Sequence, residues 1–412
     1  MSRITSVRGR IVYNSRGSRT VEVDVISDGK FLGRACAPSG ASVGIHEVRN
    51  FPDGGPEASL AAITGSAGRF KGLNPGDSGA VHAAVREMDD TPDYSIAGGA
   101  SAFAITIAAA YSAAAAAGVP LYRVLDPNVE PRFPYPLGNV LGGGAHAGPG
   151  SPDIQEILVC ATGLRDIREA IEANLAVHKE LGLVLRKKDR LFAGGKGDEG
   201  GWAPRACSAE ALEMAAEACE NLGYALGKEV SLGVDFAAST QWDREKGAYS
   251  YSRDGFENSP GEQIDYAAGI IEKYKLIYAE DAVHEEEFDG MAELTRRFPG
   301  VLVAGDDLTV TSAAMLRKAV KKGSCNAAIL KVNQAGSLYD AMKFAAEATA
   351  GGIRLVTSHR SGETTDAHVT HIGIATGSVM LKVGAVGGER VAKANELIRL
   401  SEQGLIHGMA GI

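Results

Sequence analysis

Cysteine, basic charge and long apolar runs are all scarce in this 412-residue chain. The five cysteines are scattered, odd in number and without CxxC spacing, which argues against a zinc site or a disulfide framework and favours a reducing, cytoplasmic compartment. With 42 Lys and Arg against 51 Asp and Glu, the net charge is −9. A nucleic-acid partner, which favours a basic face, is therefore not expected.

No targeting or membrane-spanning segment is expected either. Residues 1–13 lack the apolar stretch of a signal peptide. The most apolar window, 102–118, is mostly alanine and contains Thr106 and Ser112, whereas a bilayer span needs ~20 strongly apolar residues. We expect this window to form a buried helix that packs through small side chains.

Glycine is abundant, at 52 residues without a collagen-like period, which indicates tight turns and close backbone approaches. The length favours two domains. Period-two alternation predicts strands within residues 3–50, and a helical pattern follows from 56 to 124. We expect an N-terminal α+β domain over 1–125, with residues 38–47 as a mobile lid loop. The proline-rich segment 126–136 marks the boundary to a second domain over 126–412.

The second domain has the pattern of a modified (β/α)8 TIM-type barrel. Two predicted strands, within 136–143 and 153–163, precede two helices, so the barrel opens ββαα. Regular strand–helix alternation follows, at the roughly 25-residue steps that one strand and one helix need, after a longer first step that holds an extra hairpin near 248–256. Six apolar runs each end on a charged or hydrogen-bonding residue: Asp235, Glu280, Asp306, Lys331, His359 and Lys382.

Three acids end successive runs at Asp235, Glu280 and Asp306. A single acid after a strand is usually a helix cap or a solvated residue, but three at one barrel mouth would repel one another and raise one another's pKa. A divalent cation relieves that repulsion, and an all-oxygen set favours Mg²⁺. The flanking acids are interpreted as caps or solvated residues: Asp281, Asp307 and residues 285–287.

Two lysines, Lys331 and Lys382, end later runs at the same mouth. They could simply neutralise the acids. Alternatively, a metal and a second ammonium would lower the pKa of one of them, which would suit a general base. At the next run, His359, Arg360 and Ser361 form either a surface turn or a clamp for a dianion such as a phosphate.

Two glycine-rich loops carry further candidates. GGKGDEGG (194–201) matches GxGxxG, but Asp198 and Glu199 would place negative charge where a dinucleotide's pyrophosphate must lie, so that function is rejected. The loop instead presents Glu199 as a possible general acid, with Glu156 as its companion carboxylate. GGGAHAGPG (142–150) presents His146, which by itself is as consistent with a structural role as with a functional one.

These motifs together resemble the enolases, the 2-phosphoglycerate dehydratases. The matching segments follow the family's order along essentially the whole chain: NSRG, PSGASVGIHE, GNVLGGGAHAG, QE, GDEGG, GVDFAAS, AED, GDDLTVT, LKVNQ, SHRSGET and LKVGA. GGGAHAG with VGGER (386–390) is more similar to archaeal enolases than to those of animals or yeast. The resemblance implies a Mg²⁺-dependent lyase of glycolysis and gluconeogenesis that interconverts 2-phospho-D-glycerate and phosphoenolpyruvate. It also implies a small phosphorylated substrate and a cytoplasmic homodimer or octamer.

The resemblance also assigns roles to matching residues. It implies that Asp235, Glu280 and Asp306 hold one Mg²⁺, and that Ser42 binds a second Mg²⁺ that arrives with substrate. Lys331 resembles the base that removes the C2 proton, and Glu199 the acid that assists loss of the C3 hydroxyl. The remaining matches are supporting and substrate-binding residues: Glu156, His146, His359, Arg360, Ser361 and Lys382. Gln155 and Asp307 resemble residues that contact these side chains rather than the substrate or the metal.

Three departures from the family pattern, Asn14, Ser101 and Ala282, concern packing and assembly more than chemistry. Two rival functions fit this sequence less well. Related acid-sugar dehydratases or muconate-lactonising enzymes typically carry a Lys-x-Lys pair or another base on the second barrel strand, where this chain has Gln155 and Glu156. A catalytically silent scaffold should have lost a ligand or the base, and none is lost.

Overall fold

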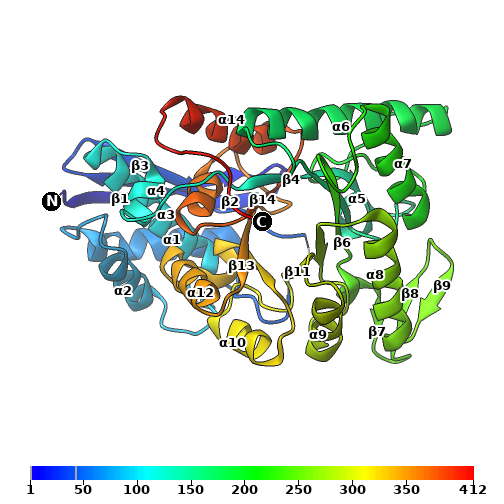
Figure 1. The fold of residues 1–412 in the computed structure, drawn as a ribbon. Helices are drawn as coiled ribbons and strands as arrows, with labels where there is room; N and C mark the ends of the chain where they lie inside the picture. The colour runs from blue at the N-terminus through cyan, green and yellow to red at the C-terminus, as the bar shows by residue number, and fades with distance from the viewer. Residues whose placement is uncertain (1, 42–43) are drawn as a thin grey trace.

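The computed structural model describes residues 2–41 and 44–412. Its N-terminal part is a three-stranded antiparallel sheet with helices packed against it (Figure 1). The strands are β1 (Ile4–Tyr13), β2 (Arg19–Ser27) and β3 (Phe31–Cys36). The helices are α1 (Gly55–Ser66), the short η1 (Ala67–Phe70), α2 (Ser78–Met88), α3 (Gly99–Ala117) and α4 (Leu121–Leu125). The predicted strands and helices of this part are confirmed.

Helix α3 is the apolar segment expected from the sequence to be a core helix. It is the one helix within 2–41 and 44–412 long and apolar enough to cross a membrane, and 78% of its most apolar 18-residue window is buried inside the protein. Its small side chains let the backbone of β3 come very close: a Cβ on Gly33 would lie 1.9 Å from the carbonyl oxygen of Ala108. The expected buried helix is confirmed.

Replacing Gly33 with alanine is therefore expected to destabilise the fold. The added methyl group would meet helix backbone rather than a movable side chain, so the sheet and α3 must separate, at a cost of about 3 kcal/mol. Urea unfolding followed by circular dichroism measures the change. Gly65→Ala in α1 is the control, because a Cβ there meets no described atom within 4 Å and alanine suits a helix. Equal midpoints for the two variants would contradict the argument.

The second part is a closed eight-stranded barrel. In spatial order, its strands are β4 (Tyr135–Gly142), β5 (Glu156–Cys160), β6 (Ser231–Asp235), β10 (Tyr278–Glu280), β11 (Leu302–Gly305), β12 (Ala327–Leu330), β13 (Arg354–Ser358) and β14 (Met380–Gly384). β5 runs antiparallel to both neighbours, and every other pair is parallel. The first residue of β5, Glu156, is consequently paired with the last residue of β6, Asp235.

Helices surround the barrel (Figure 1). They are α6 (Ile167–Lys188), α7 (Ser208–Asn221), α8 (Pro260–Tyr274), α9 (Phe288–Arg297), α10 (Ala313–Lys322), α12 (Leu338–Ala350), α13 (His368–Ala375) and α14 (Gly388–Glu402). Short helical turns are α5 (Gly144–Ala147), η2 (Ala238–Gln241) and α11 (Val332–Ala335). The extra hairpin is β7 (Trp242–Asp243), β8 (Ala248–Tyr251) and β9 (Phe256–Asn258).

The predicted α/β barrel opening ββαα is thus confirmed, with β4, β5, α6 and α7 in that order apart from the short α5. One strand end was wrong. Lys382 does not end its strand, because β14 continues to Gly384. The side chain still reaches the barrel interior, where it is buried.

Candidate active site

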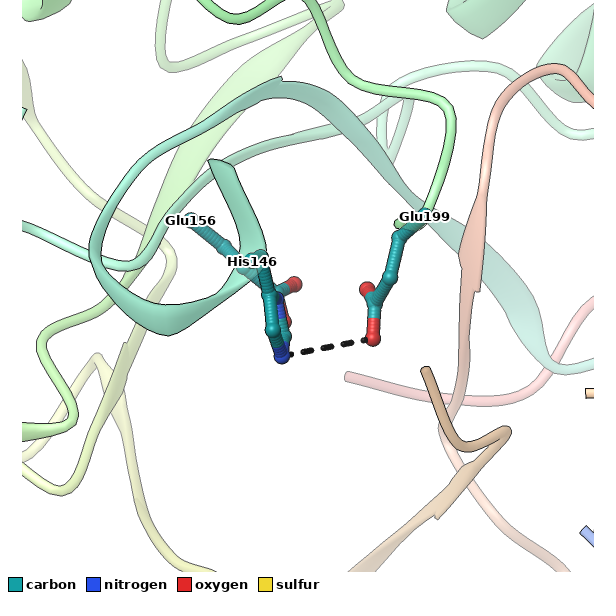
Figure 2. Close-up of side chains that lie close together, drawn as sticks. All are labelled: His146, Glu156 and Glu199. Carbon is teal, nitrogen blue, oxygen red and sulfur yellow. Dashed lines mark ion pairs between the residues drawn. The ribbon is translucent and has the colours of Figure 1, made fainter. Parts of the chain in front are cut away.

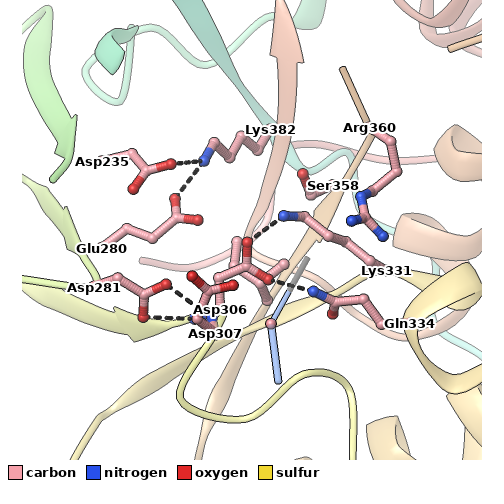
Figure 3. A network of polar contacts seen from close by, with 12 residues as sticks. Asp235, Glu280, Asp281, Asp306, Asp307, Lys331, Gln334, Ser358, Arg360 and Lys382 are labelled. Atoms are coloured by element: carbon pink, nitrogen blue, oxygen red, sulfur yellow. Dashed lines mark hydrogen bonds and ion pairs between the residues drawn. The ribbon is translucent and has the colours of Figure 1, made fainter. Parts of the chain in front are cut away.

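Charged side chains from many strands meet at one end of the barrel (Figure 3). The Lys382 Nζ atom lies 2.9 Å from Asp235 Oδ2, 2.6 Å from Glu280 Oε2 and 3.5 Å from Glu156 Oε1. All of these groups are buried. Burial opposes the charge on Lys382, but the surrounding carboxylates outweigh it and raise its pKa well above the ordinary value.

Lys331, directly after β12, forms an ion pair with Asp306, directly after β11. Gln334 donates from Nε2 to the other Asp306 oxygen at 2.9 Å. Burial would lower the pKa of Lys331, but the Asp306 carboxylate raises it overall. The lowered pKa anticipated for a base depends on a metal ion and a second ammonium nearby, and without a metal ion the nearest charge to this lysine is the Asp306 anion.

Asp281 is not the cap or solvated residue that the sequence indicated. It is buried, and its two carboxylate oxygens accept the backbone N–H groups of Asp306 at 3.0 Å and Asp307 at 2.8 Å. Burial and the Asp307 and Asp306 carboxylates raise the pKa of Asp281 well above its usual value. Its contacts show a residue that orients the segment after β11. Asp307 is half-buried, and burial with the neighbouring Asp306 raises its pKa to about 8.

The acid cluster fits a divalent cation. Carboxylate oxygens of Glu280, Asp281 and Asp306 lie within 4.8 Å of one another. Within the described part of the chain, Glu280 Oε1 is buried without a hydrogen-bond partner. Burial and the nearby Asp235 carboxylate raise the pKa of Glu280 well above its usual value, which is the repulsion that a cation would relieve. The donors are all carboxylate oxygens, the type that Mg²⁺ prefers.

His146 lies between two glutamates, Glu156 and Glu199 (Figure 2). Its Nδ1 is 3.3 Å from Glu156 Oε1, and its Nε2 is 3.8 Å from Glu199 Oε1. Burial disfavours a charged ring, but Glu199 and Glu156 raise the pKa of His146 to about 9. Burial and the Glu199 charge raise the pKa of Glu156, whereas the pKa of Glu199 is lowered well below its usual value despite burial, chiefly by His359 and His146.

His359 and Arg360 complete the site from the end of β13. His359 Nε2 lies 3.0 Å from Glu199 Oε2, and Asn139 Nδ2 donates to the same oxygen at 3.3 Å. The Arg360 guanidinium, which is buried, donates to both carboxylate oxygens of Glu47 at 3.1 and 3.2 Å. A carboxylate from the loop 38–47 therefore contacts the guanidinium that the sequence assigned to binding a substrate dianion.

One cavity gathers nearly all of the predicted site residues. It is lined by His146, Glu156, Glu199, Asp235, Asp306, Lys331, His359, Arg360, Ser361 and Lys382, together with Glu47 and Gln155. Glu280 is reached through its contact with Lys382. Ser42, assigned to the second metal ion, lies outside the described residues. The sequence placed these residues at loop and strand ends, and the fold brings the described ones together.

Sequence reasoning missed several residues that support the site. Glu47 ends the small-residue loop as the acid of its His-Glu pair, a signal that could have marked it. Gln334 belongs to the LKVNQ segment but was assigned no role. Arg390, the last residue of VGGER, is fully buried and contacts His359. No local pattern in the sequence distinguishes a buried arginine from an exposed one in the first turn of a helix.

Comparison with known families matches both halves of the chain. The family model described as "Enolase, N-terminal domain" matches residues 4–125, and "Enolase, C-terminal TIM barrel domain" matches residues 130–408. Together these matches cover almost the whole sequence.

Curated relatives extend over the same length. A protein named enolase from Methanothermobacter thermautotrophicus is 45% identical over 402 residues, which covers 97% of this chain and 96% of the relative. The enolase of Halobacterium salinarum is 44% identical over 410 residues, covering 98% and 100%. That of Pyrobaculum aerophilum is 42% identical over 399 residues, covering 95% of each.

Proposed function

This chain belongs to the enolase family, and from that premise we propose how its residues carry out the dehydration of 2-phosphoglycerate to phosphoenolpyruvate in glycolysis. The protein is a lyase, a phosphopyruvate hydratase. The observation that carries the proposal is the convergence of a lysine, a glutamate pair and an acid cluster in one buried cavity. The reaction needs a base at C2, an acid at the C3 hydroxyl and positive charge near the substrate carboxylate.

Lys331 is proposed as the base that accepts the C2 proton. Its Nζ faces the cavity, and its position is maintained by Asp306 and by the backbone N–H of Lys331, which donates to Thr311 Oγ1 at 2.9 Å. The C2 proton is very weakly acidic because its removal builds a second negative charge on the adjacent carboxylate. Lys382, buried among acids on the neighbouring side, is proposed as the ammonium that faces that carboxylate.

Asp235, Glu280 and Asp306 are proposed as the ligands of one Mg²⁺, and Ser42 as a ligand of a second that accompanies substrate. When bound, Mg²⁺ supplies positive charge that stabilises the anion formed at C2 and weakens the hold of Asp306 on the Lys331 ammonium. Asp281 is a poorer ligand candidate despite its proximity to Glu280, because both of its oxygens already accept backbone N–H groups.

Glu199 is proposed as the acid that protonates the departing C3 hydroxide, supported by Glu156 and His146. Hydroxide leaves poorly without a proton, so one of these groups must supply it. The surroundings of the two glutamates shift their pKa values in opposite directions: the pKa of Glu156 is raised and that of Glu199 is lowered. His146, with its pKa raised to about 9, lies between them and can carry a proton from one to the other.

Arg360 and Ser361, next to His359, are proposed to bind the phosphate. For this, the phosphate must replace or join the Glu47 carboxylate on the Arg360 guanidinium. Closing of the loop 38–47 over bound substrate would move Glu47 at the same time and exclude water.

The function is tested by incubating purified protein with 2-phosphoglycerate and Mg²⁺ and recording the ultraviolet absorbance of the enol phosphate. We expect product formation that stops on addition of EDTA. Absence of product between about pH 6 and 9, the range in which a lysine or histidine base operates, would refute the proposal.

Glu199→Gln is expected to lower dehydration by about 10³-fold while C2 hydrogen exchange in D₂O continues. The amide keeps the size and the contacts with His359 and Asn139 but cannot donate a carboxylic proton. Mass spectrometry of recovered 2-phosphoglycerate measures exchange, and absorbance measures dehydration. Glu396→Gln on α14, at the contact with His371 of α13, is the control. Loss of exchange together with dehydration would show that Glu199 is not specific to the second step.

We also propose the larger organisation that the family implies. Residues 1–125 form a capping domain that bears the lid, and 126–412 form the catalytic domain. The assembly is proposed to be a homodimer or an octamer, in the cytoplasm, without a nucleic-acid partner. Size-exclusion chromatography with light scattering tests the assembly.

A further inference from the structure

A fully buried arginine behind the site, Arg390, links two loops that carry site residues. It lies in the first turn of α14, with 0% relative exposure. Its Nη1 donates to His359 Nδ1 at 2.7 Å and to the Arg360 carbonyl at 2.6 Å. Its Nη2 donates to the Asp198 carbonyl at 2.9 Å and to the Ser361 carbonyl at 2.6 Å.

These contacts use all four N–H bonds of the two terminal nitrogens. Three acceptors belong to the segment after β13, and the fourth, the Asp198 carbonyl, directly precedes Glu199. The 194–201 loop is also packed closely against the end of β14 and the β14–α14 connection. A Cβ on Gly384 would lie 2.0 Å from the Glu199 carbonyl oxygen, and one on Gly200 would lie 2.1 Å from the Val386 carbonyl oxygen.

The contact with His359 decides where that ring carries its proton. An arginine can only donate, so the His359 Nδ1 atom must be an unprotonated acceptor. The single proton of the neutral ring then lies on Nε2 and is donated to Glu199 Oε2 at 3.0 Å. The other tautomer would place two N–H groups against each other and leave Glu199 facing a lone pair.

We propose that Arg390 is a positioning residue for the dehydration step. It fixes His359 as a neutral Nε2–H donor and holds Glu199 and the phosphate-binding segment in a constant position relative to each other. Arg390 reaches Glu199 only through His359 and the loop backbone. A lysine at this position could not reproduce the arrangement, because one ammonium has three donors and lacks the planar fork that spans four acceptors.

The environment of the ring agrees with a neutral His359. Charged groups face it from the 194–201 loop (Glu199), from α14 (Arg390) and from its own loop (Glu363). Burial is the largest influence, and with Arg390 it outweighs the two carboxylates and lowers the pKa of His359 to about 4. Removal of Arg390 would eliminate the nearby cation and free Nδ1, so protonation of the ring would become easier.

The test uses the full-length, Mg²⁺-loaded protein. It rests on the proposed function, in which Lys331 removes the C2 proton and Glu199 acts in the loss of the C3 hydroxyl. In Arg390→Met we expect the ratio of dehydration to C2 exchange to fall about 100-fold, the size of effect that a small misplacement of catalytic groups produces. The matched control is Lys393→Met, which removes another fully buried cation from α14 that contacts the Thr364 carbonyl and Glu363. The control should lose stability while its ratio stays unchanged.

The pH profile gives a readout that mere loss of stability would not move. In Arg390→Met, loss of the nearby cation should raise the pKa of His359, so that protonation of the ring begins at a higher pH than in wild type. The imidazolium would lower the pKa of Glu199 further and so oppose its protonation more strongly than the neutral ring does. The dehydration rate of the variant relative to wild type should therefore fall toward low pH, and the exchange rate should show no such trend.

The wild-type protein provides an independent measurement if the variant does not fold. The ¹⁵N chemical shifts of His359, assigned with a His359→Gln sample, should show the neutral Nε2–H form. An Nδ1–H ring, an imidazolium, or an unchanged ratio in folded Arg390→Met would overturn the inference. Failure of the proposed function is distinguishable, because wild type would then lack dehydration altogether.

Discussion

Lys331→Ala is expected to abolish C2 hydrogen exchange and to lower overall turnover by about 10⁴-fold, the upper range for loss of a general base. Both measurements should fall together because proton removal precedes loss of the C3 hydroxyl. This result would differ from that of Glu199→Gln, in which exchange continues. Exchange is followed by deuterium incorporation into 2-phosphoglycerate, and turnover by absorbance of the product.

Lys331→Arg is the decisive companion variant. It keeps a cation beside Asp306 in the buried site, but a guanidinium does not release its proton at accessible pH. If Lys331 served only to neutralise the acids, the arginine would restore much of the activity. We expect it to be as inactive as the alanine variant, while Lys322→Ala, at an exposed ion pair with Asp289, retains wild-type rates. Persistent exchange in either Lys331 variant would contradict the assignment.

Removal of divalent metal is expected to lower turnover by at least about 10⁴-fold, because it takes away several kcal/mol of charge stabilisation and each 1.36 kcal/mol corresponds to a factor of ten. EDTA followed by dialysis tests this, and Mg²⁺ should restore the rate. Glu280→Gln should weaken Mg²⁺ binding, measured by titration calorimetry in the absence of substrate. This carboxylate has an oxygen without a hydrogen-bond partner among the described residues, and it is therefore open to a ligand.

The same variant has a second expected consequence. Glu280 is one of three carboxylates around the Lys382 ammonium, so its neutralisation should leave that lysine paired mainly with Asp235 and Glu156. Asp265→Asn, at an exposed ion pair with Arg297, is the control for loss of one acid. Unaltered Mg²⁺ affinity in Glu280→Gln would remove Glu280 from the proposed ligand set.

Local patterns in the sequence were sufficient for the barrel and for the positions of its strand-end residues. Asp235, Glu280 and Asp306 were expected at one mouth because strand–helix units of regular length bring equivalent strand ends to the same side. The structure brings the three acids together there, Glu280 through its contact with Lys382 and its proximity to Asp306. Lys382 was misplaced only in register, because an apolar run does not show where the last ladder hydrogen bond forms.

Burial and charge balance were harder to infer. Asp281 was interpreted as a cap or solvated residue, yet it accepts the N–H groups of Asp306 and Asp307 inside the protein. The pKa of Lys331 is raised by Asp306, whereas the lowered value anticipated for a base depends on a metal ion beside it. For both side chains the nearest partner comes from another segment of the barrel mouth, which local patterns in the sequence do not show.

What the sequence determined by itself was the family, the order of the elements and the identity of the acids, lysines and histidines available for chemistry. Only the tertiary structure decided which of them are hydrogen-bonded or ion-paired to one another. β5 runs against both neighbouring strands, so Glu156 reaches the mouth from the start of its strand rather than from its end. His146, Glu199, His359 and Arg390 each arrive from a different further segment. Tautomers and pKa values depend on separations of a few ångströms between such segments, and those separations exist only after the chain has folded.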